Sequence, residues 1–305
     1  MDARAALGAV AAGRTLSRSD AEGAMASVMA GDATPAQLGG LLAALAIRGE
    51  TVDEIAGFAA AMRAAAVPVR IADGAIDTCG TGGDRSGSFN ISTVAAIVAA
   101  AAGARVAKHG NRAASSACGS ADVLEALGVK IDLGPDSVAV CVEQVGLGFM
   151  FAPNFHPAMR HAGPVRREIG IRTIFNVLGP LANPAGVKRQ LLGVPSAALG
   201  ERMVQVLREL GAERALVVHS TDGLDEISPS GPTRTWELRD GAISEGQLTP
   251  DDVGLTRAGV DAVRGGDSRT NAAIARAVLS GETRDGARAA VLLNAGAACY
   301  VAGLA

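Results

Sequence analysis

The sequence predicts an α/β protein in which a small all-helical domain is joined to a large α/β domain with a central, mainly parallel sheet. Two patterns predict this. Helix-start signals are spaced over the first 67 residues, and beyond residue 68 short apolar runs alternate with helical stretches. Strand, helix and strand repeated in this way are typical of a parallel sheet covered on both faces. Because 49% of the 305 residues are hydrophobic, the chain can bury a core of that size.

The helical domain is recognised by its capping signals. Ser17, Thr34 and Thr51 each precede a helical pattern and are followed three positions later by an acidic or amide residue, as in a capping box. Leucines between residues 38 and 45 follow helical spacing. We therefore expect a helical unit whose apolar face packs on another part of the protein, as a scaffold or a subunit interface.

The large domain begins where the hydrophobic period changes, after Pro68. Short apolar runs predict strands at residues 76–78, 105–107, 129–131, 149–152, 190–194, 215–219 and 233–238. Longer stretches predict helices at residues 94–102, 120–127, 136–145, 196–210, 271–279 and 284–301. Residues 156–186 interrupt this alternation, and we interpret them as an excursion back to the helical domain. The helical domain then comprises residues 1–67 and 156–186, and the α/β domain comprises residues 68–155 and 187–305.

The first of two glycine-rich turns, at residues 80–84, directly follows a predicted strand. It leads through Asn90, Ser92 and Thr93, which stand where a helix N-cap is expected, into an apolar helix. Glycines allow backbone N–H groups to approach a ligand closely, and a helix N-terminus attracts negative charge. The turn therefore predicts an anion-binding site.

The second turn, at residues 108–120, follows the next predicted strand and contains three serines, two glycines, Lys108 and Arg112. Hydroxyls, amides and cations in one loop suit a phosphate group. Both turns fall at the carboxyl ends of strands, where α/β sheets bind their ligands. Two such turns predict a ligand with two phosphate ends.

Asp225 and Glu226 follow another predicted strand and place paired carboxylates at its carboxyl end. Such a pair suits a hard divalent cation, above all Mg²⁺ shared with a diphosphate. Taken alone, the pair is more often a solvated acidic turn. Its position beside two predicted phosphate loops favours the metal.

The excursion segment carries Arg166 and Arg167, one of which could bind a carboxylate with both arms of its guanidinium. An arginine pair alone more often lies on the surface. His109 and His156 are candidate bases, although a structural role is the commoner one for each. No residue is assigned as an obligatory acid or base.

Composition limits the partners. A formal net charge of −3 with interspersed charges argues against a nucleic-acid binder, and we expect small-molecule substrates. The four cysteines lack the spacing of a disulfide framework or a zinc site. We expect no membrane association, because the longest apolar run is too short to cross a bilayer and no signal pattern opens the chain. The expected location is the cytoplasm.

Together the motifs resemble those of anthranilate phosphoribosyltransferases, and they follow that family's order along the whole chain. They are GTGGD at residues 80–84, NIST at 90–93, KHGNR at 108–112, GSADVLEALG at 119–128, HPAM at 156–159, RTIFN at 172–176, LGPL at 178–181 and DE at 225–226. The resemblance implies a nucleoside phosphorylase/phosphoribosyltransferase-like fold and a homodimer formed through the helical domain. It also implies that the protein transfers the phosphoribosyl group of phosphoribosyl pyrophosphate (PRPP) to anthranilate in tryptophan biosynthesis. The implied cofactor is Mg²⁺.

The resemblance also implies site residues. Its PRPP-binding positions are Gly80, Gly83, Asp84, Ser88, Asn90, Ile91, Ser92, Thr93, Lys108, His109, Gly110, Asn111, Arg112, Ala113, Ala114, Ser115, Ser116 and Ser120. Its anthranilate-binding positions are Gly80, Asn111 and Arg166, and its Mg²⁺ ligands are Ser92, Asp225 and Glu226. The family usually has Ser where Cys118 stands, and a thiol is a weaker hydrogen-bonding partner.

Two alternative functions stay open at this point. A pyrimidine nucleoside phosphorylase shares the fold, but it would need a single phosphate site and a pyrimidine pocket. A non-catalytic relative that binds nucleic acid is disfavoured by the acidic charge balance and by the retained Asp225–Glu226 pair.

Overall fold

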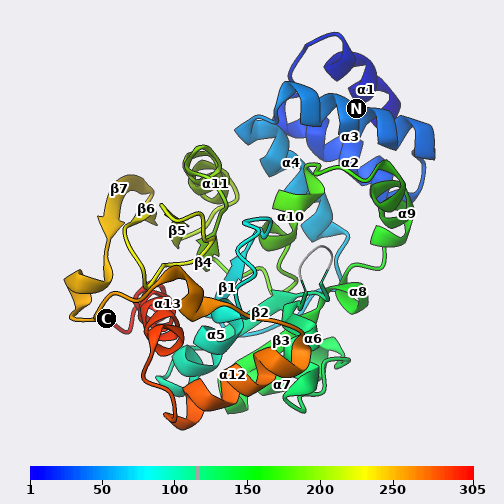
Figure 1. Cartoon of the computed structure of the whole chain (residues 1–305). Helices are drawn as coiled ribbons and strands as arrows, with labels where there is room; N and C mark the ends of the chain where they lie inside the picture. Colours follow the sequence, from blue (N-terminus) through cyan, green and yellow to red (C-terminus); the bar gives the residue numbers. More distant parts are fainter. Residues whose placement is uncertain (114–116) are drawn as a thin grey trace.

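The computed structural model describes residues 1–113 and 117–305. A group of N-terminal helices stands beside a larger part built on one twisted sheet (Figure 1). The sheet has seven strands in the order β3-β2-β1-β4-β5-β6-β7. The strands are β1 (Ile76–Gly80), β2 (Val106–Gly110), β3 (Leu147–Phe151), β4 (Arg189–Gly193), β5 (Arg214–Ser220), β6 (Thr233–Arg239) and β7 (Ala242–Leu248).

The five strands β1 to β5 are parallel, whereas β6 and β7 pair antiparallel at one edge. The predicted mainly parallel sheet and the predicted fold class are confirmed. From β1 the chain first builds β2 and β3 on one side and later β4 and β5 on the other. The carboxyl ends of β1 and β4 therefore meet at a topological switch point, where α/β sheets hold their ligands.

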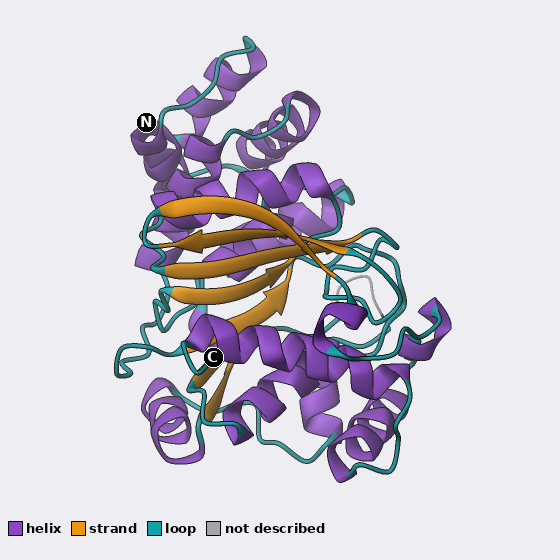
Figure 2. Ribbon diagram, turned by 90° about the vertical axis from the view of Figure 1, so that its left-hand side faces the viewer, coloured by secondary structure: helices purple, strands orange, loops and turns teal. Residues whose placement is uncertain are grey.

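Helices cover both faces of the sheet (Figure 2). On one face α5 (Ile91–Ala101) and α13 (Gly286–Ala302) pack together against β1, and α12 (Ser268–Ser280) packs on α13. On the other face α11 (Ala197–Glu209) packs on β5 and β6 and also contacts α4 (Val52–Ala64). The flank near β3 carries α6 (Ser120–Ala126), α7 (Pro135–Val145) and the short α8 (Ala152–Phe155). Two short 3₁₀ helices, η1 (Pro250–Val253) and η2 (Val260–Val263), precede α12.

The N-terminal helices are α1 (Ala3–Ala11), α2 (Arg18–Ala30), α3 (Pro35–Arg48) and α4. Ser17 caps α2, and complete capping boxes start α3 at Thr34 and α4 at Thr51, as the sequence predicts. The helix α1 was not predicted, although Asp2 caps it by accepting a hydrogen bond from the Ala5 N–H.

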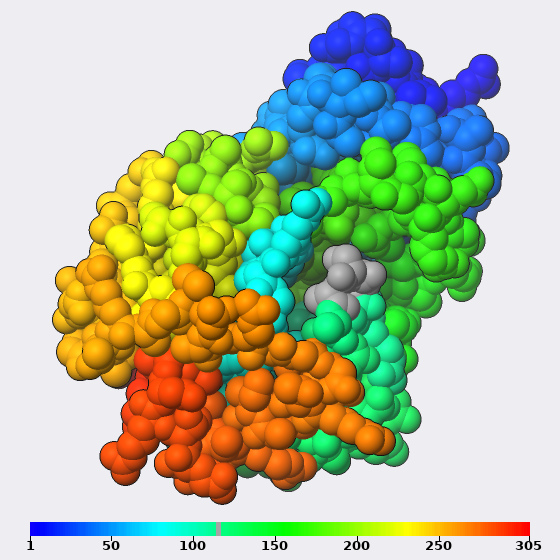
Figure 3. All heavy atoms as spheres, viewed as in Figure 1, coloured from blue at the N-terminus to red at the C-terminus, as the bar shows by residue number. Residues whose placement is uncertain are grey.

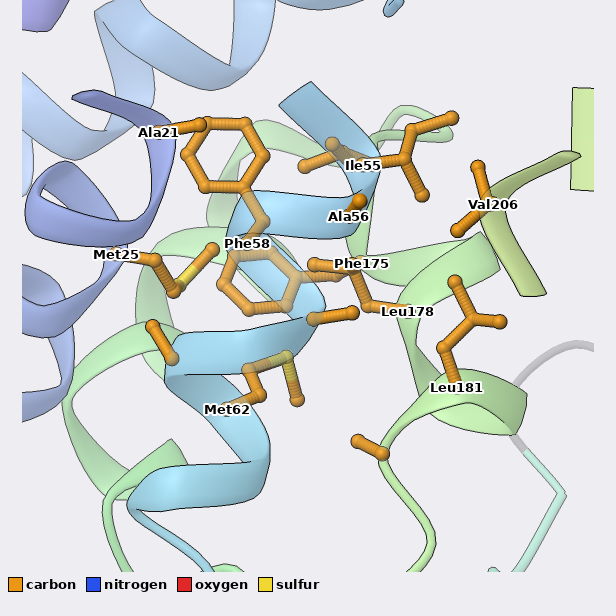
Figure 4. Packing of buried hydrophobic residues seen from close by; sticks show 14 of the residues in the cluster. Ala21, Met25, Ile55, Ala56, Phe58, Met62, Phe175, Leu178, Leu181 and Val206 are labelled. Atoms are coloured by element: carbon orange, nitrogen blue, oxygen red, sulfur yellow. The ribbon is translucent and has the colours of Figure 1, made fainter. Parts of the chain in front are cut away.

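The segment of residues 156–186 forms α9 (Met159–Ile169) and α10 (Phe175–Leu181). The first contacts α2 and α3, and the second contacts α4. One continuous hydrophobic core contains Phe58 of α4, Phe175 and Leu178 of α10, and Val206 of α11 (Figure 4). The core thus links the N-terminal helices, this segment and one face of the sheet.

The structure corrects the predicted strand at residues 129–131, which is a loop. Its apolar signal comes from Ile131, which packs beside Phe149 and Leu124 without joining the sheet. The predicted strand at residues 149–152 starts earlier, as β3, and Ala152 instead begins α8.

The strand β7 was missed because most of its residues are exposed and its polar residues Ser244, Glu245 and Gln247 interrupt the apolar pattern of a strand. It is held by the two-residue turn Asp240–Gly241, where both residues have positive φ, as the tightest hairpins require.

Candidate active site at the carboxyl ends of the parallel strands

Three loops meet at the carboxyl end of the sheet. The first glycine-rich turn follows β1, the second follows β2, and the loop with Asp225 and Glu226 follows β5. The space-filling view shows a recess flanked by the first turn, in cyan, and by the green segment that contains α9 and α10 (Figure 3). The structure therefore brings together three motifs that lie up to 145 positions apart in the sequence, from Gly80 to Asp225.

The glycine-rich turn is built around the side chain of Asp225. The Gly82 N–H donates to Asp225 Oδ2 at 2.9 Å. A Cβ on Gly80 would lie only 2.5 Å from the same oxygen, so this position leaves no room for a side chain. Gly82 and Gly83 both have positive φ, which glycine adopts without strain. The glycines thus let the turn close over a buried carboxylate.

The far end of this turn is anchored to the segment before α12. Ser88 forms an isolated antiparallel bridge with Arg264. The Phe89 N–H donates to the Val263 carbonyl at 2.9 Å, and the Gly265 N–H donates to the Gly87 carbonyl at 2.8 Å. The turn is therefore held at both ends, by Asp225 near β1 and by residues 263–265 near α5.

Asn90 occupies the N-cap position of α5, but its side chain does not cap the helix. Its Nδ2 donates to the Cys118 carbonyl at 3.1 Å, and its Oδ1 accepts from Asn271 Nδ2 at 3.0 Å. Asn90 thus connects the two turns with α12. In the first turn of α5, Ile91 and Thr93 are buried, and the Ser92 N–H donates to Glu226 Oε1 at 3.1 Å.

The acidic pair is buried, so it is not a solvated turn: Asp225 is 9% exposed and Glu226 is 8% exposed. Burial, followed by repulsion from Asp84, raises the pKa of Asp225 to about 7. Burial, followed by repulsion from Asp225, raises the pKa of Glu226 to about 8, against the opposing attraction of Lys108. The site therefore concentrates negative charge that the protein alone compensates poorly.

These carboxylates fit a divalent cation. The Oδ2 atom of Asp84 is buried and has no hydrogen-bond donor among the described residues. Within residues 1–113 and 117–305, no three His, Cys, Asp or Glu side chains are arranged as a complete metal site. An incomplete set of one or two carboxylates is typical of Mg²⁺, which takes its other ligands from substrate phosphates and water.

The second turn is anchored by a buried polar network at the end of β1 and β2. Asp77 accepts hydrogen bonds from the His109 N–H at 3.3 Å and from Asn183 Nδ2 at 2.8 Å. Lys108 is buried, and its Nζ donates to the Thr78 carbonyl. The network connects the start of the KHGNR motif with the chain that returns from α10.

The rest of the described turn is shaped by Asp122. Its Oδ2 accepts hydrogen bonds from the Ala113 and Gly119 N–H groups, both at 2.9 Å. Ser120 Oγ donates to the Asn111 carbonyl at 3.4 Å. A Cβ on Gly110 would overlap this Ser120 hydroxyl. Three of the predicted PRPP-binding residues, namely Ala114, Ser115 and Ser116, lie outside the described residues.

Arg112 has protein partners in this structure. Its guanidinium forms ion pairs with Asp122 at 3.0 Å and with Glu125 at 2.8 Å, and its side chain is 46% exposed. A phosphate would have to compete with these two carboxylates for the guanidinium. The phosphate contact of Arg112 stays a prediction.

The two arginines of the excursion helix differ. Arg167 is exposed, whereas Arg166 is half-buried, with its guanidinium carbon 5.0 Å from the centre of the Phe175 ring. Burial lowers the pKa of Arg166. A guanidinium stacked in this way is positioned to bind a planar carboxylate.

The rings of His109 and His156 are in contact at a tilt of 55°, with their centres 5.0 Å apart. Burial, followed by repulsion from His156, lowers the pKa of His109 to about 3, and burial also lowers the pKa of His156. Both rings are therefore neutral at physiological pH. Their buried Nε2 atoms have no hydrogen-bond partner among the described residues, so each has capacity left for a ligand.

Four residues that contact the predicted site were not singled out from the sequence. They are Asp77, Arg172, Asn183 and Asn271. Asp77 carried a usable signal, because a carboxylate within an apolar strand needs a partner. Arg172 lies in the RTIFN motif but gave no local signal of the turn it contacts.

Comparison with known proteins gives a consistent result. Residues 4–66 match the helical bundle domain of a glycosyl transferase family, and residues 72–305 match its a/b domain. The anthranilate phosphoribosyltransferase of Rubrobacter xylanophilus is 55% identical over 99% of this chain and 88% of its own length. That of Chloroflexus aurantiacus is 56% identical over 100% of this chain and 90% of its own.

The similar solved structures are of the same family as these relatives. The chain is similar to the crystal structure of anthranilate phosphoribosyltransferase from Thermus thermophilus, with a TM-score of 0.94, 48% identity and coverage of 100% of this chain and 90% of that one. It is also similar to the Saccharomyces cerevisiae enzyme in complex with PRPP and Mg, with a TM-score of 0.89, 28% identity and coverage of 98% and 88%.

Proposed function

The chain belongs to the anthranilate phosphoribosyltransferase family, and from this premise we propose how its residues bind and align the two substrates. The protein transfers the phosphoribosyl group of PRPP to anthranilate, a step of tryptophan biosynthesis that yields N-(5-phosphoribosyl)anthranilate and pyrophosphate. The observation that supports our assignment of residues best is the contact between the first glycine-rich turn and Asp225, because it joins a phosphate-binding element to a cation-binding one.

PRPP is held between the two turns. The first turn and the N-terminus of α5, from Gly80 to Thr93, bind the diphosphate and ribose through backbone N–H groups and hydroxyls. The second turn, from Lys108 to Ser120, binds the remaining phosphate. The buried Lys108 supplies a positive charge to this pocket.

Mg²⁺ is the proposed cofactor, and the Saccharomyces cerevisiae relative has been crystallised with PRPP and Mg. Ser92, Asp225 and Glu226 would hold it, with Asp84 close by. When bound, the cation offsets the charge of the carboxylates and of the pyrophosphate that leaves. The chain's own contribution is to keep these oxygen atoms together and partly shielded from water.

Anthranilate lies on the side of α9. Arg166 binds its carboxylate, and Asn111 and Gly80 line its approach to the sugar. The amine nitrogen has a free lone pair and attacks the anomeric carbon, whose bond to the pyrophosphate oxygen breaks. Pyrophosphate leaves, and the positively charged nitrogen then releases one proton to solvent. We assign no obligatory base, which agrees with the lowered pKa values of His109 and His156, because burial makes both imidazoles weak proton acceptors. Alignment of the two substrates and exclusion of water supply the remaining rate enhancement.

We also propose the domain boundaries and the assembly. Residues 1–67 and 156–186 form the helical domain, a division supported by the contacts of α9 with α2 and α3. Two copies pair through this domain, where Ile47 is 87% exposed. Light scattering on the purified protein tests this, and a monomeric mass at assay concentrations would refute it.

The proposed location is the cytoplasm. The four cysteines form no disulfide with one another, which suits a reducing compartment. Among the described residues, the structure has no helix with the length and apolar character needed to cross a membrane.

A fluorescence assay that follows the loss of anthranilate tests the function directly. We expect turnover that requires both PRPP and Mg²⁺. Phosphorolysis of thymidine or uridine without anthranilate turnover would favour the nucleoside phosphorylase, and salt-sensitive binding of DNA without any turnover would favour the nucleic-acid binder.

A further inference from the structure

Arg172 reaches across to the first glycine-rich turn from the segment between α9 and α10. Its Nη2 donates to the carbonyl oxygen of Gly82 at 3.3 Å, although 90 residues separate the two in the chain. The surrounding segments lie side by side in the cartoon and space-filling views (Figures 1 and 3). The tip of the turn is therefore in contact with the segment that carries the proposed anthranilate arginine.

The same guanidinium occupies the space that a side chain at Gly83 would take. A Cβ on Gly83 would overlap Arg172 Nη1 and would lie 2.9 Å from its Nη2. By contrast, a Cβ on Gly82 or Gly87 would meet no atom within 4 Å. All three glycines have positive φ, between 64° and 85°, so alanine would be strained at each of them. They differ in whether a Cβ would also meet Arg172. Of these three glycines, only Gly83 lies where a side chain would overlap the guanidinium of Arg172.

Gly82 is thus held from two directions. Its N–H donates to Asp225 on the sheet side, and its carbonyl accepts from Arg172 on the side of the helical segment. A turn rich in glycine has many accessible conformations when it is not held. We propose that Arg172 is a positioning residue that fixes the tip of this turn in the conformation that binds the diphosphate of PRPP.

This inference rests on the proposed function, and it predicts that Arg172 affects the binding of only one of the two substrates. Arg166 stacks on Phe175, and this contact does not involve Arg172. Loss of Arg172 should therefore weaken the binding of PRPP and leave the binding of anthranilate nearly unchanged. A residue that only stabilises the fold would instead lower the melting temperature and the active fraction without separating the two substrates.

The first experiment compares Arg172→Ala and Arg172→Lys with the unmodified protein. We expect Arg172→Ala to raise KM for PRPP about 3- to 10-fold, the effect of a charge-assisted hydrogen bond discounted for its exposure, with KM for anthranilate within about twofold. Arg172→Lys, which keeps a charged donor, should recover part of the loss. Calorimetric titration of PRPP with Mg²⁺ reports the same change without turnover.

The second experiment uses the glycines as matched probes. Gly83→Ala should weaken PRPP binding as Arg172→Ala does, because it displaces the guanidinium. In an Arg172→Ala background it should weaken binding by much less. Gly211→Ala, outside both turns, carries the strain of a positive φ of 78° with no atom within 4 Å of its Cβ, and it should change KM for PRPP by less than about twofold.

The results of these experiments distinguish a failure of the proposed function from a failure of the proposed role of Arg172. Absence of anthranilate turnover in the unmodified protein would refute the proposed function. Normal turnover together with an unchanged KM for PRPP in Arg172→Ala would refute only the role of Arg172. Equal effects of Gly83→Ala in both backgrounds would also refute it, because the clash with Arg172 would then not be the cause.

Discussion

Replacing Asp225 with Asn and Glu226 with Gln should abolish turnover and at the same time stabilise the metal-free protein at alkaline pH. Both carboxylates are buried and have raised pKa values, of about 7 and about 8. Their amide counterparts are uncharged but retain an acceptor oxygen for the Gly82 and Ser92 N–H groups. The hydrogen bonds can therefore survive while the repulsion and the cation ligands are lost.

The expected gain in folding free energy follows from the raised pKa values of the two carboxyl groups. Raising the pKa of a carboxyl group from 3.8 to about 7 costs about 4 kcal/mol of folding free energy once the group is ionised. The shift of Glu226 includes the same repulsion, so the two are not added, and we expect a net gain of roughly 2 to 4 kcal/mol for the double variant at pH 8. The sign depends on pH. The native carboxyls destabilise the fold as pH rises from about 4 towards 8, and the amides do not titrate.

Thermal unfolding in EDTA at pH 5 and pH 8 measures this, and the anthranilate assay with Mg²⁺ measures turnover. We expect the melting temperature of the double variant to exceed that of the unmodified protein at pH 8 by several degrees, with a smaller gap at pH 5. Asp122→Asn is the control with the opposite sign, because donors from Ala113 and Gly119 lower the pKa of Asp122. A gap that is negative or independent of pH would refute the repulsion, and normal turnover would refute the metal assignment.

Three further predictions concern separate features of the site. Arg166→Lys should raise KM for anthranilate about 10-fold and leave KM for PRPP unchanged in steady-state kinetics, since lysine lacks the planar fork; equal changes in both constants would contradict this. In the Asp225→Asn/Glu226→Gln background, where the two raised carboxyls no longer titrate, stability to urea should fall by about 1 kcal/mol between pH 6.5 and pH 5.5, because His109 stays neutral in the fold and gains a proton when unfolded, and adding His109→Asn should remove most of this slope. Gly193→Ala should destabilise the protein by at least about 2 kcal/mol, because its Cβ would overlap the backbone carbonyl of Asp225, whereas Gly179→Ala, with open space around it, should not; similar melting temperatures for the two variants would show that the backbone can yield.

The features that could be predicted from the sequence are those encoded over a few neighbouring residues. The capping boxes at Thr34 and Thr51 were predicted and confirmed, because a cap depends on residues three positions apart. The alternation of strands and helices gave the fold class for the same reason. Where the local signal had another cause, as at Ile131, the predicted strand was wrong.

The partners of individual side chains were decided by the tertiary structure. Sequence motifs placed Asp225, Glu226 and Arg112 near phosphate loops, but only the fold shows that the first two are buried and that Arg112 pairs with Asp122 and Glu125.

The contact of Arg172 with Gly82 also depends on the fold, because it joins two segments that no local pattern relates. Backbone preference is a property of short stretches of chain, and these the sequence determined by itself. The burial of a charge and the choice of its partner depend on which distant segments pack together, so only the tertiary structure could determine them.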